Sequence, residues 1–170
     1  MKKITRQYAI SMYQNLGAMA LGHMDETTLS AVLDNLDRFG KVQEDFQKLS
    51  QELAKRLYEG KDEEQKNAFF ALVGKMESEK DIEKRMEIEK ELKECPEFYE
   101  LYIKHLNVLS KLLCKEIEMD ITEVDKDAFI AGVVKGKKDA PVHEIVAFFA
   151  PMFKEEERQT DLSELDEYFN

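Results

Sequence analysis

The stretch LDNLDRFGKVQEDFQKLSQELAKRL, residues 33–57, decides the fold class of this chain. Apolar residues recur in it every three or four positions, which is the period of one face of an α-helix. With the residues before it, the stretch predicts one unusually long helix from Asp25 or Thr27 to Gly60. Gly40 lies in the middle, where it costs about 1 kcal/mol relative to alanine, so we expect a kink or a close helix contact there. The predicted stripe consists of Leu29, Val32, Leu33, Leu36, Phe39, Val42, Phe46, Leu49, Leu53 and Leu57.

The composition of the 170 residues also indicates a helical protein. Hydrophobic residues make up 43% and charged residues 36%, with only 7 Gly and 3 Pro, a mixture typical of solvated helices with one apolar stripe each. The net charge of -11 argues against a general duplex-binding role, because neutralising phosphates needs a concentrated Lys and Arg surface. We therefore expect no direct nucleic-acid binding, although an acidic surface can imitate nucleic acid in a basic groove.

Further helices are predicted on both sides of the long one. A first helix is capped by Thr5, and residues 62–94, rich in Glu and Lys, suit a projecting helical arm. Pro96 begins another helix, and two shorter helices follow over 126–134 and from Pro141. We predict a mainly α protein, a bundle of long antiparallel helices with one short β element around residues 116–122. Residues 1–153 would form a single helical domain, followed by an acidic C-terminal tail over 154–170.

The segment KEIEMDITEVD, residues 115–125, differs because its apolar and polar residues alternate. Ile117, Met119 and Ile121 would point to one side of a half-buried β-strand. A single strand cannot satisfy its own backbone groups, so its partner is another segment of this chain, the same segment of a second copy, or an edge of another protein. Pairing with a second copy leads us to predict a homodimer with these three residues at its interface.

The tail is a second candidate contact. Seven acidic residues against Lys154 and Arg158 give residues 154–170 a net charge of -5. The tail could dock on its own body, remain disordered or bind another protein. Its candidate interface residues recur at helical spacing and are Leu162, Leu165, Tyr168 and Phe169.

No catalytic, metal-binding or cofactor-binding residue is predicted. None of the three histidines has a glutamate three positions before it, and no glycine loop of the phosphate-binding kind occurs. Cys95 and Cys114 lack the spacing of a zinc or redox pair, which indicates a reducing compartment. We expect no signal peptide and no membrane span, and hence a cytoplasmic location.

The order of features resembles a family of small proteins of unknown function encoded by tailed phages and prophages. The resemblance rests on residues 33–57, on SKLLCKEIEMDITEVD (110–125) and on VHEIVAFFAPMF (142–153). Family members similarly end a helix with Leu-Leu, enter an alternating strand like EVEVDI and finish with a helix close to LEPMI. The likeness covers Ile4 to Leu57 and Lys111 to Phe153, while residues 62–94 look like an insertion. It implies a phage setting in a bacterial host and no catalytic residues.

We therefore expect a non-catalytic accessory or assembly protein that acts through contacts with an unidentified phage or host protein. The alternative is an inhibitor of a bacterial defence or nucleic-acid-processing protein, which would use an acidic surface to occupy a basic groove. A third alternative is an enzyme with an unrecognised site.

Overall fold

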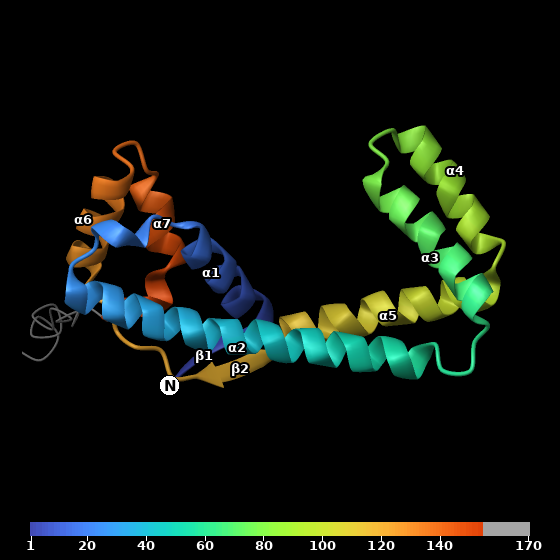
Figure 1. Cartoon of the computed structure of the whole chain (residues 1–170), viewed down its shortest axis with the longest axis horizontal. Coiled ribbons are helices and arrows are strands. Elements are labelled where there is room, and N and C mark those ends of the chain that lie inside the picture. Colours follow the sequence, from blue (N-terminus) through green and yellow to red (C-terminus); the bar gives the residue numbers. More distant parts are fainter. Residues whose placement is uncertain (155–170) are drawn as a thin grey trace, which may run out of the picture.

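The structure is a computed structural model, and it describes residues 1–154. It confirms a mainly α protein with one short β element. A two-stranded sheet and seven α-helices make up the described residues, with short 3-10 turns at Leu21–His23 and Ala150–Met152 (Figure 1). The elements are β1 (Lys2–Thr5), α1 (Arg6–Ala18), α2 (Glu26–Leu57), α3 (Glu63–Ser78), α4 (Ile82–Lys93), α5 (Pro96–Cys114), β2 (Glu116–Met119), α6 (Lys126–Gly136) and α7 (Val142–Phe148).

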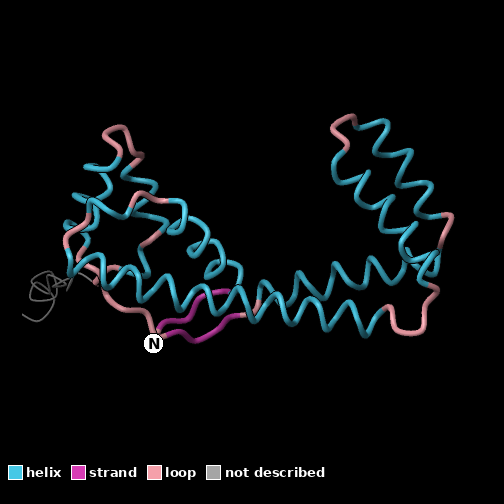
Figure 2. Tube along the Cα trace, viewed as in Figure 1, coloured by secondary structure: helices cyan, strands magenta, loops and turns pink. Residues whose placement is uncertain are grey.

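The helices surround two separate hydrophobic clusters, joined by two long antiparallel helices (Figure 1). At one end lies the part we call the body, made of β1, β2, α1, α6, α7 and the first half of α2. The second half of α2 runs beside α5 away from the body, and the α3–α4 hairpin rises from their far end (Figure 2). We call these parts together the arm. The 32 residues of α2 span ~48 Å, which is why one helix serves both clusters.

The expected long helix is present, and its glycine has the expected close contact. Asp25 caps α2 by accepting a hydrogen bond from the Thr28 N–H at 3.0 Å. A Cβ at Gly40 would lie 3.0 Å from Cε2 of Tyr13, so this position lets α1 pack closely on α2. The helix continues through Gly40 without a break.

The alternating strand pairs within its own chain. β2 lies antiparallel to β1, with Ile4 opposite Ile117 and Lys2 opposite Met119. The premise of the strand-paired homodimer, a strand without a partner in its own chain, is therefore wrong. The sequence reasoning missed β1 because KKIT is only four residues long and contains a single apolar residue. Thr5 ends the strand and caps α1, as expected.

The segment after β2 is held against α2 by a buried amide. Asn35 is fully buried, and its Nδ2 donates to the Thr122 carbonyl at 2.8 Å while its Oδ1 accepts from the Thr122 N–H at 2.8 Å. A second long-range contact joins this segment to the end of the described chain, where the Val124 N–H donates to the Met152 carbonyl at 2.8 Å. The body is thus tied together by residues far apart in sequence.

Residues 62–94 form two helices with a break, and they project from the far end of the paired helices α2 and α5 (Figure 1). Asp81 starts α4 by accepting hydrogen bonds from the backbone N–H groups of Glu83 and Lys84. The hairpin is fixed by aromatic packing at its base, where Phe69 of α3 stacks on Phe98 of α5 with ring centroids 5.8 Å apart. The one buried residue of α4, Leu92, also lies at this base, in the same hydrophobic cluster as Phe69 and Phe98.

Candidate protein-binding surface

The strand residues predicted as an interface belong to the core of the body. Met119 and Ile121 are each 8% exposed and lie in the body cluster, and Ile117 packs against it. Because these side chains already cover their own core, they do not offer a free contact surface. The tail residues of the same prediction, Leu162, Leu165, Tyr168 and Phe169, lie outside the described residues.

The carboxylates of Glu118, on the other face of β2, and of Asp120, just after β2, belong to a solvated surface. Glu118 pairs with Lys3 at 3.6 Å, and Asp120 pairs with Arg38 at 3.3 Å. Exposed ion pairs of this kind contribute about 0–1 kcal/mol. The alternation of β2 therefore sorts apolar side chains toward the core and charged ones toward water.

Side chains that could support catalysis or metal binding are scattered. His23 follows α1, His105 lies in α5 and His143 in α7, while Cys95 and Cys114 are both exposed. Within residues 1–154, no three His, Cys, Asp or Glu side chains gather in a way that could hold a metal ion.

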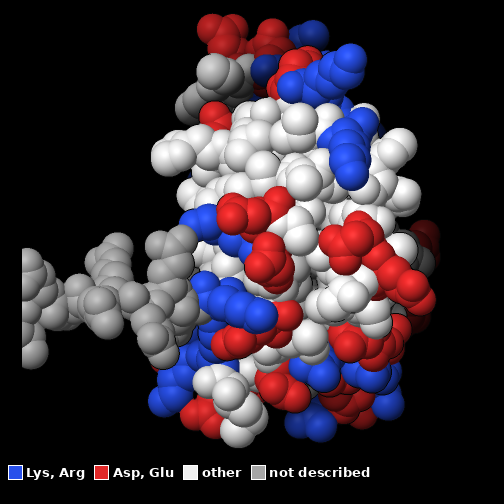
Figure 3. All heavy atoms as spheres, turned by 90° about the vertical axis from the view of Figure 1, so that its left-hand side faces the viewer, with Lys and Arg blue, Asp and Glu red and all other residues white. Residues whose placement is uncertain are grey.

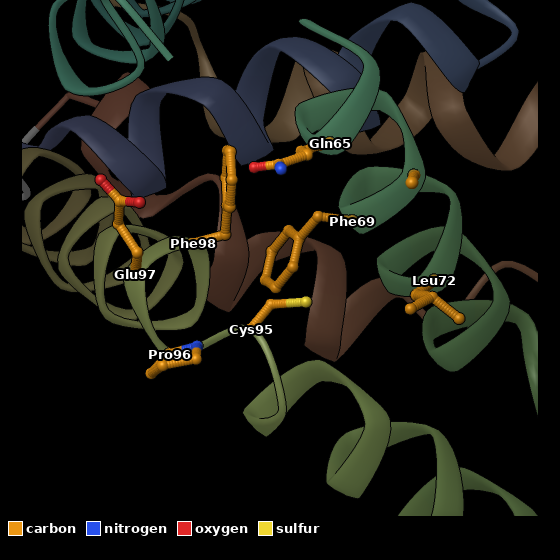
Figure 4. A pocket seen from close by; sticks show the side chains of 8 residues that line it. Gln65, Phe69, Leu72, Cys95, Pro96, Glu97 and Phe98 are labelled. Atoms are coloured by element: carbon orange, nitrogen blue, oxygen red, sulfur yellow. The ribbon is translucent and has the colours of Figure 1, made fainter. Parts of the chain in front are cut away.

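One apolar hollow of about 480 Å³ lies where α3 meets the start of α5 (Figure 4). Figure 4 shows Cys95 and the ring of Phe69 pointing toward each other across it. Nucleophilic chemistry needs a base beside the thiol, and the lining contains no His or Lys. The hollow is lined by Gln65, Ala68, Phe69, Leu72, Cys95, Pro96, Glu97 and Phe98.

A second hollow of about 450 Å³ adjoins two buried polar atoms. Within the described residues, the Tyr58 hydroxyl and His105 Nε2 have no hydrogen-bond partner, and the two rings lie 5.9 Å apart. Burial raises the pKa of Tyr58 and lowers the pKa of His105, because it disfavours the charged form of each. The His105 ring is half-buried in the arm, and its Nε2 atom is enclosed.

Most of the large exposed apolar side chains of the described residues lie on the arm. Of the seven, only Met1 and Leu33 belong to the body. The other five are Leu49 on α2, Ile82 and Met86 on α4, and Ile103 and Leu106 on α5. A pair of helices without a third layer cannot bury every apolar residue, which explains why these side chains meet water.

Two of these stripes meet at Tyr99. On α4, Ile82 and Met86 share a helical stripe with Glu89 and Lys93, at positions i, i+4, i+7 and i+11. Lys93 Nζ lies 5.7 Å from the Tyr99 ring centroid, and the Tyr99 hydroxyl donates to Glu89 Oε1 at 3.4 Å.

On α5, Tyr99 in turn shares a stripe with Ile103 and Leu106, at positions i, i+4 and i+7. We call the surface made by Ile82, Met86, Tyr99, Ile103 and Leu106 the elbow. The elbow depends on the turn between α4 and α5, so periodicity in the sequence does not reveal it.

The charges beside these surfaces are of both signs. Figure 3 shows the end of the body, where Lys and Arg are interspersed with Asp and Glu over the lower part, below an area without charges. On the arm, ion pairs such as Arg56 with Glu52 at 2.8 Å combine both signs along one helix. On these described surfaces the charges do not form the continuous acidic array that an imitator of nucleic acid would present, and the acidic tail lies outside the described residues.

No protein-family model, curated protein or solved structure matches the chain. The resemblance to the phage family therefore stays a prediction. No helix within residues 1–154 has the length and apolar character that crossing a bilayer requires.

Proposed function

We propose that this chain is a non-catalytic accessory or assembly protein that acts by binding another protein through its arm. The phage or prophage setting and the cytoplasm of a bacterial host belong to the same proposal, and they rest on the sequence resemblance. The partner is a phage or host protein.

One observation carries the proposal, namely the contrast between the two ends of the molecule. The body buries large apolar side chains such as Phe39, Phe129 and Met152, whereas Ile82 is 75% exposed and Met86 is 55% exposed. Exposed apolar side chains grouped along one surface mark contact sites in soluble proteins, whereas scattered single ones are ordinary. Four of them, Ile82, Met86, Ile103 and Leu106, lie in the two helical stripes that meet at Tyr99.

Affinity capture of the tagged protein from a lysate of its host tests this role. Ile103→Lys and Met86→Lys place a charge on the elbow, and both positions are partly exposed, so the fold should tolerate the change. We expect the wild-type chain to recover a defined protein that both variants fail to recover. The matched control is Leu33→Lys, since Leu33 is 47% exposed but lies at the body end of α2. Equal recovery by all four proteins would contradict a role for the elbow.

A further inference from the structure

The elbow contains two apolar stripes that do not cover each other within one chain. Ile82 and Met86 remain 75% and 55% exposed, and Ile103 and Leu106 remain 38% and 43% exposed. The end of the α4 stripe nearest α5 contacts Tyr99 through Glu89 and Lys93. The rest of α4 continues to the tip of the hairpin, away from α5 (Figure 1).

Charged residues border each stripe in a complementary order. On α4, Glu87 follows Met86 and Lys90 comes three positions later. On α5, Glu100 and Lys104 lie four positions apart and flank Ile103. Each pair thus places a negative and a positive charge about one helical turn apart. All four side chains are exposed, and none forms an ion pair within residues 1–154.

If α4 of one molecule lies antiparallel on α5 of another, the charges match. Glu87 then faces Lys104 and Lys90 faces Glu100, because Glu precedes Lys along both helices and antiparallel packing reverses the direction of one of them. The same placement brings Met86 over Ile103 and Leu106. Residues spaced by three and four positions interdigitate in this kind of helix packing.

We propose that the occupant of the elbow is a second copy of this chain, with α4 of each molecule packed antiparallel on α5 of the other. Both halves of the contact occur on every chain, so one twofold axis forms the contact twice and closes the assembly as a dimer. This inference rests on the proposed function, in which the arm is the contact surface. It also replaces pairing through β2 as the basis of a homodimer.

The test uses two full-length variants that exchange charges without altering the net charge. One carries Glu87→Lys and Lys90→Glu on α4, and the other carries Glu100→Lys and Lys104→Glu on α5. In a homodimer of either variant, like charges face each other at both contacts. We expect this repulsion to weaken the affinity of dimerisation by about tenfold or more. In an equimolar mixture every contact is again complementary, so the two variants should form a mixed dimer.

Sedimentation velocity and light scattering provide the readout. The wild-type chain and the mixture should each have twice the 19.8 kDa mass of one chain, while each variant alone should be mainly monomeric at the same concentration. Helical circular dichroism of both variants confirms that they fold. Leu33→Lys is the control for an exposed apolar residue outside the elbow, and it should remain dimeric.

Four results would overturn the inference. A dimer that both charge exchanges leave intact would place the interface elsewhere. A wild-type monomer would rule out self-association. In that case the proposed function would still be supported if the wild-type chain captured another protein and Met86→Lys abolished the capture. If the wild-type chain is a monomer and the double variant Leu162→Ser, Leu165→Ser dimerises, the elbow is the binding site of the chain's own C-terminal segment. A monomer that also captures nothing through the elbow would contradict both proposals.

Discussion

Replacing Asn35 by alanine should destabilise the body strongly, because this one side chain satisfies two backbone groups of Thr122. Each hydrogen bond contributes about 0.5–1.5 kcal/mol net, and a buried polar group left unpaired costs about 1–3 kcal/mol. Asn35 is fully buried, while Thr122 is half-buried, so water can replace only part of what is lost. We therefore expect Asn35→Ala to lower the free energy of unfolding by about 2–4 kcal/mol. For a protein of this size the loss corresponds to a fall in Tm of roughly 4–16 °C.

Thermal and urea unfolding followed by circular dichroism measure this change. Asn15→Ala is the matched control, because Asn15 is exposed and its amide donates only to the Ser11 carbonyl of its own helix, at 2.8 Å. The control should change stability by less than about 0.5 kcal/mol. If Asn35→Ala is no more destabilising than Asn15→Ala, the amide contact does not hold the segment after β2 to α2.

Two other positions give independent tests. Gly132→Ala should destabilise the body, since a Cβ there would lie 2.5 Å from Cγ of Met24 and 3.0 Å from its Cα. The control is Gly74→Ala, because nothing lies within 4 Å of a Cβ at Gly74. Equal changes in the free energy of unfolding of the two variants would contradict this packing. His105 should make the stability of the arm depend on pH. Its pKa is lower in the folded chain than in the unfolded chain, so the unfolded chain binds the proton more readily. The stability it contributes is complete above the unfolded pKa of about 6.5 and is lost as pH falls through the lower folded pKa. His105→Phe should therefore lose less Tm than wild type between pH 7.5 and 5.5, and equal losses would contradict a buried neutral imidazole.

The sequence predicts those parts of the fold that local chemistry determines. The stripe of α2, the caps at Thr5 and Asp25 and the start of α5 at Pro96 all follow from side chains near each boundary. The alternation from Ile117 to Ile121 likewise predicts which side chains face the core.

Features that depend on distant residues were not predicted. β1 has one buried apolar residue, Ile4, and it becomes a strand because β2 lies beside it. Asn35 interrupts an apolar stripe, and its role depends on Thr122, 87 positions away. The elbow requires the turn that brings α4 to Tyr99. Asp81 is the one local signal that was overlooked, since its side chain caps α4 and marks the break in residues 62–94.

Oxidation of methionines by dilute peroxide, followed by mass spectrometry, tests most directly whether the elbow is a contact surface. Met86 is 55% exposed in the single chain and Met1 is 87% exposed, whereas Met12 and Met152 are fully buried and serve as internal references. An exposed thioether oxidises readily, and a covered one does not. We predict that, in the host lysate or at concentrations where the protein assembles, Met86 becomes as protected as Met12 while Met1 stays reactive. Oxidation of Met86 at an unchanged rate under both conditions would contradict the claim that the arm binds a protein through its elbow.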